Sequence, residues 1–184
     1  MNRLLEWDKT AFLLINGLQN SVWDYVLGWP TYLGSLFVGL PLLLILIATL
    51  DRKGLVPKFS ILLVMLLCLN SLVDFLKAAV ARPRPFTFFA QSGFHVNVLF
   101  DRPGDPSFPS GHAAFAFGTA VMLNFLYRNK LIWLYPLAFL IAFSRIYIGV
   151  HFPSDVIGGA LLGIFTSGVI ILVIKLFCPG RIQK

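Results

Sequence analysis

The sequence predicts an all-α integral membrane protein: a helical bundle with about five transmembrane helices and an N-terminal interfacial helix. Of its 184 residues, 58% are hydrophobic and only 12% are charged, whereas soluble domains carry about 25% charged residues. No apolar run shows the period-two alternation of membrane barrel strands. Because a backbone in the hydrocarbon core must satisfy its own hydrogen bonds, the runs are expected to be helices. The length suits a single domain over residues 1–184.

The chain is basic, with a formal net charge of +7 from 15 Lys and Arg against 8 Asp and Glu. In a soluble protein this balance would favour nucleic-acid binding. In a membrane protein, cations near helix ends set the orientation or contact lipid head groups. We therefore expect membrane lipids as partners, and no nucleic acid.

Residues 1–28 mix apolar and charged positions, and Trp7, Trp23 and Trp29 accompany them. Tryptophan favours the boundary between membrane and water. We expect a helix that lies in or near this interface without spanning the membrane. A helix packed on the bundle is the alternative.

Apolar runs of spanning length follow, since a membrane-spanning helix needs about 17–25 residues. They cover residues 33–50, 59–77, 112–128, 131–148 and 155–177. The last run contains Gly159 and Gly163, a small-residue spacing that predicts close packing against another helix.

The cations divide almost evenly between the two ends of these runs. One end receives Arg52, Lys53, Lys58, Arg128, Lys130, Lys175, Arg181 and Lys184. The other receives Arg3, Lys9, Lys77, Arg82, Arg84, Arg102 and Arg145, with most of the acidic residues. If the second set is retained for function, the positive-inside rule places the short basic loops and the C-terminus in the cytoplasm. The end with the second set then faces outward.

Residues 82–111 form the long connection on that outward side. Loops of this length in a compact domain are usually functional or disordered, and Phe86, Phe88, Phe89 and Phe94 make this one too apolar for disorder. We expect an extracytoplasmic loop at the functional site. It either dips into the outer leaflet and lines a lipid access route, or packs over the bundle.

The second apolar run ends in cations. Lys77 is followed after six residues by Arg84-Pro85, where proline ends the helix. Arginine offers a planar fork suited to phosphate, and lysine a compact charge. Taken alone, the pair would be ordinary side chains that reach from a helix end to the interface. Asp74, one turn earlier, is expected to pair with Lys77.

The segment Pro109-Ser110-Gly111-His112 opens the third run. A helix N-terminus presents free N–H groups and the positive end of its dipole, which suits an anion. Ser110 is placed to cap the helix or to donate to an oxyanion, and Gly111 allows a ligand close to the backbone. An N-cap turn beside an interfacial histidine is the alternative.

A third group of polar residues lies between the last two runs. His151 and Asp155 are four residues apart, about one helical turn. Asp155 is expected to accept the Nδ1–H of His151 and leave Nε2 as a nucleophile. Arg145 is expected to join an anion clamp. The alternative is a buried His–Asp pair with a structural role.

One topology brings all three groups to the same end of the helices. Two histidines and a carboxylate form a possible zinc ligand set. However, the cations Lys77, Arg84 and Arg145 would repel a divalent ion and attract a phosphate. We therefore expect a phosphate site with no metal and no cofactor.

Together these segments resemble the motifs of the type 2 phosphatidic acid phosphatase family, which shares its site pattern with vanadium haloperoxidases and bacterial acid phosphatases. The family motifs are Lys, six residues and Arg-Pro; Pro-Ser-Gly-His; and Ser-Arg, five residues, His, three residues and Asp. Residues 77–155 match all three in order and without departure. Any one motif alone would be weak evidence for this family, but the match to all three motifs together is specific.

The resemblance implies a two-step phosphoryl transfer. By analogy His151 attacks phosphorus to form a phosphohistidine, Asp155 fixes its tautomer, and His112 protonates the leaving oxygen. The implied phosphate-binding groups are Lys77, Arg84, Ser110, Gly111 and Arg145. This agrees with the need of phosphoryl transfer for positioning and charge neutralisation.

Family members with this small core commonly act in bacterial envelopes. We expect a metal-independent phosphatase of the bacterial inner (cytoplasmic) membrane, with its site facing the periplasm or outside, that hydrolyses a lipid phosphomonoester or diphosphate. The candidate substrates are undecaprenyl diphosphate, phosphatidylglycerol phosphate, phosphatidic acid and lipid A 1-phosphate. The motifs recognise phosphate and do not choose among these lipids.

Alternative functions stay open. A lipid phosphotransferase would pass the phosphoryl group to an acceptor other than water. A non-catalytic lipid-binding or transport protein would keep the fold, although the intact His112, His151 and Asp155 count against it. A vanadate-dependent peroxidase is disfavoured, because nothing in this small chain indicates an oxidant pocket.

Overall fold

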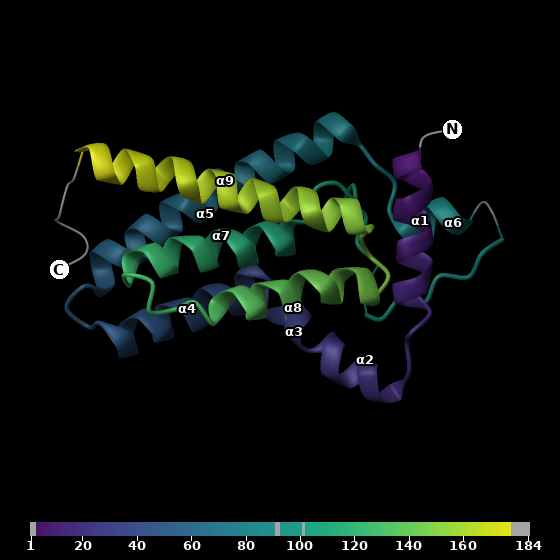
Figure 1. Ribbon diagram of the computed structural model, residues 1–184, viewed down its shortest axis with the longest axis horizontal. Helices are drawn as coiled ribbons and strands as arrows, with labels where there is room; N and C mark the ends of the chain where they lie inside the picture. Colours follow the sequence, from purple (N-terminus) through teal and green to yellow (C-terminus); the bar gives the residue numbers. More distant parts are fainter. Residues whose placement is uncertain (1–2, 91–92, 101, 178–184) are drawn as a thin grey trace.

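The computed structural model describes residues 3–90, 93–100 and 102–177, and the regular structure in these ranges is helical. The helices are α1 (Arg3–Asn16), α2 (Ser21–Gly28), α3 (Pro30–Leu33), α4 (Leu36–Leu50), α5 (Leu55–Val80), α6 (Pro85–Ala90), α7 (Gly111–Leu126), α8 (Leu134–Tyr147) and α9 (Pro153–Phe177). The long helices run along the molecule, and α1 lies across one end of them (Figure 1). The predicted all-α fold class is confirmed. Arg181 and Lys184, used in the orientation argument, lie outside the described residues.

Every apolar run forms a helix, but the helices differ in length. Within the described residues, the stretches Leu55–Ala90 and Pro153–Phe177 are long and apolar enough to cross a membrane. The bent pair Ser21–Leu33 and Leu36–Leu50, at 72° to each other, would make a third span if counted as one. Helices α7 and α8 have 16 and 14 residues, about 24 and 21 Å at about 1.5 Å per residue. Five full spans therefore remain a prediction.

Residues with positive φ follow the C-terminal ends of α7 and α8. After α7, Arg128 and Asn129 adopt left-handed conformations with φ of 54° and 64°. After α8, Gly149 has a φ of 87°, and a Cβ there would lie 2.3 Å from the carbonyl oxygen of Asn97. Glycine is needed at this close approach, and the loop that it starts carries His151.

The N-terminal segment differs from the expected single helix. It breaks after α1, and α2 begins where the Asn20 side chain accepts hydrogen bonds from the backbone N–H groups of Val22 and Trp23. Asparagine at this position therefore starts a new helix.

Helix α1 is packed on the bundle. Its Phe12 is fully buried, and the ring lies 5.8 Å from that of Phe89 and 5.4 Å from that of Phe152. Trp7 on the same helix is half-exposed. The packed alternative is thus present in the structure, while the depth of α1 in a membrane remains a prediction.

The connection between α5 and α7 folds over the same end of the bundle. Its helix α6 places Phe88 and Phe89 against Phe152, at ring distances of 6.1 and 6.2 Å. Phe94 remains mostly exposed. The described part of this connection thus packs over the bundle, and a role in lipid access remains a prediction.

Helices α7 and α9 touch through glycine. A Cβ at Gly159 would lie 2.2 Å from the carbonyl oxygen of Ser110, and one at Gly163 would lie 2.3 Å from that of Ala114. No larger side chain fits without a shift, which confirms the close packing predicted from the spacing. This contact aligns the starts of both helices, so that the Ser110 N–H donates to the carbonyl oxygen of Asp155 at 2.9 Å.

Candidate active site

The structure brings the three groups of motif residues together at the end of the bundle that α1 covers (Figure 1). Helices α5 and α8 end there and supply Lys77 and Arg145 from their last turns. Helices α7 and α9 begin there and supply His112 and Asp155 from their first turns. Antiparallel neighbours thus bring distant parts of the sequence to one place.

His151 is buried in the loop between α8 and α9. Its Nε2 atom lies 3.3 Å from Nη1 of Arg84. Arginine has no acceptor, so Nε2 must be the unprotonated nitrogen and the proton lies on Nδ1. This is the tautomer that a nucleophilic Nε2 requires.

The imidazole of His151 is neutral at pH 7. Burial lowers its pKa to about 4, the nearby charges of Arg84 and Arg145 act in the same direction, and Asp155 opposes them. A neutral ring keeps the Nε2 lone pair available.

Asp155 is fully buried and accepts several hydrogen bonds. Its Oδ1 accepts from Nη1 of Arg82 at 2.6 Å, and its Oδ2 accepts from the Phe152 N–H at 2.8 Å and from the Ser107 hydroxyl. Its Oδ2 lies 3.7 Å from Nδ1 of His151, which is longer than a hydrogen bond. The expected direct His–Asp hydrogen bond is therefore absent between these described residues, because other donors hold the carboxylate.

Ser107 lies between the two residues. Its Oγ is 3.4 Å from Nδ1 of His151 and also touches Oδ2 of Asp155. The side chain is fully buried. The serine thus links the ring to the carboxylate, and sequence reasoning missed it, although it stands two residues before the second motif.

The cations Lys77 and Arg84 share an unexpected partner. Lys77 Nζ forms a close ion pair with Oδ2 of Asp105, and Arg84 Nη2 lies 2.7 Å from Oδ1. Arg84 Nε also donates to the backbone oxygen of Asp105 at 2.8 Å. The expected pairing of Lys77 with Asp74 is wrong, since Asp74 accepts from Asn70 at 2.9 Å. The carboxylate thus bridges two cations that were expected to hold phosphate.

Burial alone would raise the pKa of Asp105, but the ion pairs with Lys77 and Arg84 lower it to about 2. The Asp105 side chain therefore carries its negative charge at neutral pH. It was not found from the sequence, because a single Asp in a long loop carries no pattern.

Arg145 is buried and incompletely paired. Its Nη1 donates to the hydroxyl of Thr31 in α3, while Nε has no hydrogen-bond partner among the described residues. An unpaired buried donor is unfavourable. A bound anion would satisfy it, which supports the expected role of Arg145 in an anion clamp.

The segment at the start of α7 has mixed surroundings. The Ser110 hydroxyl is buried and accepts from the Ala113 N–H at 3.5 Å, a helix cap. Gly111 and His112 line a mostly apolar cavity of about 300 Å³, together with Ser35, Asn70 and apolar side chains of α4, α5 and α7. His112 therefore stands where the polar site meets an apolar space.

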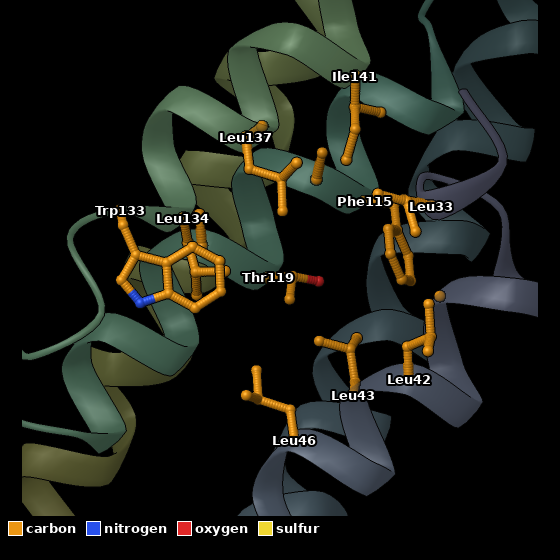
Figure 2. A pocket seen from close by; sticks show the side chains of 14 residues that line it. Leu33, Leu42, Leu43, Leu46, Phe115, Thr119, Trp133, Leu134, Leu137 and Ile141 are labelled. Atoms are coloured by element: carbon orange, nitrogen blue, oxygen red, sulfur yellow. The ribbon is translucent and has the colours of Figure 1, made fainter. Parts of the chain in front are cut away.

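A second cavity, of about 240 Å³, lies between α4, α7 and α8 (Figure 2). Its walls are mostly apolar, and the Thr119 hydroxyl and the indole nitrogen of Trp133 are the polar atoms drawn among the labelled side chains. Phe115 lines both cavities. None of the expected phosphate-binding residues lines this second space.

Metal ligands do not converge in the described part of the chain, where no three His, Cys, Asp or Glu side chains group for an ion. Metal independence remains a prediction. The charges around His151 suit an anion.

An apolar helical bundle with a buried histidine among cations at one end is the arrangement that the motifs predict for a membrane-embedded phosphoryl-transfer protein. The family model of the PAP2 superfamily matches residues 58–177, well over half of the sequence. The chain belongs to this superfamily, and the resemblance that the motifs indicated is confirmed.

Relatives extend the match beyond the motifs. The undecaprenyl-diphosphatase of Sulfolobus acidocaldarius is 34% identical over 179 residues, 94% of this chain and 80% of that protein. The lipid A 4'-phosphatase of Bacteroides thetaiotaomicron is 29% identical over 174 residues, 88% of this chain and 74% of that protein. The solved structure of a PAP2 type phosphatidylglycerolphosphate phosphatase from Bacillus subtilis matches with a TM-score of 0.80 at 25% identity, covering 98% of this chain and 90% of that one.

Proposed function

We propose that this protein is a metal-independent membrane lipid phosphatase that works through a phosphohistidine. The observation that carries the proposal is the buried His151, whose Nε2 atom lies 3.3 Å from Nη1 of Arg84. The relatives that match most of the chain are named for phosphatase activity on lipid phosphates, which supports this reaction class.

In the first step the phosphate group of the lipid binds among Lys77, Arg84 and Arg145. Nε2 of His151 forms a bond to phosphorus as the bond from phosphorus to the leaving oxygen breaks. His112, which the bound phosphate anion keeps protonated, gives its proton to that oxygen, and the free lipid product departs. The phosphorylated ring keeps its Nδ1–H and becomes cationic, and the carboxylate of Asp155 stabilises this charge.

In the second step water attacks phosphorus and releases phosphate from His151. His112, now neutral, takes a proton from that water and so returns to its starting state. The backbone N–H groups at the start of α7 and the cations neutralise the charge on the phosphate oxygens throughout.

The lipid part of the substrate lies on the side of His112. This residue protonates the leaving oxygen, and it also lines the apolar cavity between α4, α5 and α7. The candidate substrates are undecaprenyl diphosphate, phosphatidylglycerol phosphate, phosphatidic acid and lipid A 1-phosphate. The names of the relatives support the first two, and the relative from Bacteroides thetaiotaomicron is named for the 4'-phosphate of lipid A instead of the 1-phosphate.

The proposed location is the bacterial inner membrane, with the site facing outward. The end of the bundle opposite the site carries Arg52, Lys53, Arg128 and Lys130 near short connections. Such loops favour the cytoplasmic side.

The test is phosphate release from these four lipids by the purified protein in detergent with EDTA. The wild type should release phosphate from at least one lipid, and His151→Ala from none. His95→Ala, which changes an exposed histidine outside the site, should match the wild type. Equal turnover by His151→Ala would overturn the mechanism. No release by a folded wild type would overturn the hydrolase assignment, and added alcohol acceptors would then test for a phosphotransferase.

A further inference from the structure

Asp8 is a buried carboxylate on α1, the helix that crosses the end of the bundle (Figure 1). It is 2% exposed, and a buried charge needs partners. Its Oδ1 accepts from the Ser154 N–H at 2.8 Å, and its Oδ2 accepts from the Ser154 hydroxyl and from Nη2 of Arg82, both at 2.6 Å. Arg82 lies within the first motif and Ser154 directly precedes Asp155 of the third, so Asp8 connects α1 to the site.

Arg82 joins Asp8 to Asp155. One arm of its guanidinium, Nη2, lies 2.6 Å from the Asp8 carboxylate, and the other, Nη1, lies 2.6 Å from Oδ1 of Asp155. The Cζ atom of the guanidinium lies over the ring of Phe152, 4.3 Å from the ring centroid. These three contacts together fix the orientation of the planar guanidinium of Arg82.

This arrangement separates Arg82 from Arg84, its neighbour two residues on. Arg84 faces His151 and Asp105, where phosphate is proposed to bind. Arg82 faces away from that clamp and toward the carboxylate behind His151. The Arg-Pro-Arg-Pro segment therefore supplies two arginines to opposite sides of the histidine.

The charges of the cluster fit the proposed intermediate. Two carboxylates and one guanidinium carry a formal charge of −1 while His151 is neutral. Phosphorylation at Nε2 makes the ring cationic and balances that charge. Removing the charge of Asp8 would leave Arg82 competing with the ring for Asp155.

Helix α1 braces the histidine loop at both ends. Asp8 holds Ser154 at the start of α9, and the Asn16 side chain donates to the backbone oxygen of Tyr147 at the end of α8, at 3.0 Å. His151 lies between these anchors. The position of its ring thus depends on α1.

We propose that Asp8 and Arg82 are positioning residues of the active site. Asp8 fixes the guanidinium of Arg82, and Arg82 holds Oδ1 of Asp155 so that Oδ2 faces Ser107 and the Nδ1–H of His151. The inference rests on the proposed phosphatase function for its kinetic consequences.

The kinetic test compares Asp8→Asn, Arg82→Lys, Arg82→Met and Glu6→Gln with the wild type. Asp8→Asn keeps the shape and loses the charge, and kcat should fall by about ten- to a hundredfold through misplacement of the reacting groups. KM should stay within about twofold, since the phosphate clamp is unchanged. Arg82→Lys keeps the charge and should recover part of the activity lost in Arg82→Met. Glu6→Gln, an exposed acid of the same helix paired with Lys9, should behave as wild type.

A second readout does not require turnover. Nitrogen-15 NMR of the histidine rings reports the tautomer and charge of each, and His151→Ala assigns the signal of His151. The wild type should show the Nδ1–H tautomer, and Asp8→Asn should show a mixture. An unchanged kcat together with an unchanged His151 spectrum would overturn the positioning role. If the wild type turned over no lipid, the proposed function would fall, while the spectrum would still decide the role of Asp8.

Discussion

Replacing Asp105 by Asn is expected to strengthen inhibition by vanadate, a mimic of phosphorus in its five-coordinate state. The Asp105 carboxylate bridges Lys77 and Arg84, so an incoming phosphate must displace it from both cations. Asparagine removes the competing charge. It keeps the backbone oxygen that accepts from Nε of Arg84, so the arginine stays in place.

The size of the effect follows from the pKa of Asp105. The fall from 3.8 to about 2 corresponds to about 2 kcal/mol, at about 1.4 kcal/mol for each pKa unit. The side chain is 46% exposed, and solvent screening roughly halves such an interaction. About 1 kcal/mol remains, which predicts an inhibition constant for vanadate about fivefold lower.

The assay is phosphate release from the best lipid substrate at increasing vanadate concentrations. Asp74→Asn is the matched control, because this exposed acid stands one turn before Lys77 and bonds Asn70. Its inhibition constant should equal that of the wild type. An unchanged inhibition constant for vanadate in Asp105→Asn would refute the competition between the Asp105 carboxylate and the bound anion. A higher inhibition constant would mean that Asp105 arranges Lys77 and Arg84 for phosphate.

Other predictions concern the histidine and the helix contact. Ser107→Ala should lower kcat about tenfold with little change in KM, because the hydroxyl links His151 to Asp155; a changed KM alone would contradict this. The pKa of His151 is lowered from 6.5 to about 4, so the unfolded chain binds more protons between these values, and the Tm should fall as pH drops from about 6.5 toward 4. This fall should be smaller in His151→Ala, and equal slopes would count against burial of the neutral ring. Gly163→Val should cost about 1–3 kcal/mol of stability by overpacking against α7, measured by thermal unfolding; Gly168→Val, where a Cβ meets open space, is the control.

The helices and the convergence of the motifs were predictable from the sequence. The run 59–77 lies within α5 (Leu55–Val80), and the run 155–177 is nearly all of α9 (Pro153–Phe177). In a membrane the backbone of a long apolar segment must form its own hydrogen bonds, which favours a helix. Their alternating direction then brings Lys77, His112 and Arg145 to one end.

Contacts that span distant segments were not predictable. Asp8 reaches Ser154 across 146 residues, and Asp105 reaches Lys77 across 28. A single carboxylate such as Asp8 or Asp105 belongs to no motif, so the sequence alone does not identify it as a site residue. The distance from Asp155 to His151 was also missed, because it depends on the competing donors Arg82 and Ser107, which only the fold brings near.

The brace formed by α1 bears on where the catalytic unit begins. The family model starts at residue 58, and a fragment from there would contain every signature residue. Such a fragment would nevertheless release the loop of His151 from both of its anchors, at Tyr147 and Ser154. We therefore expect the smallest working unit to be larger than the recognisable signature. Chimeras that exchange N-terminal segments between such enzymes should retain an acid at the position of Asp8.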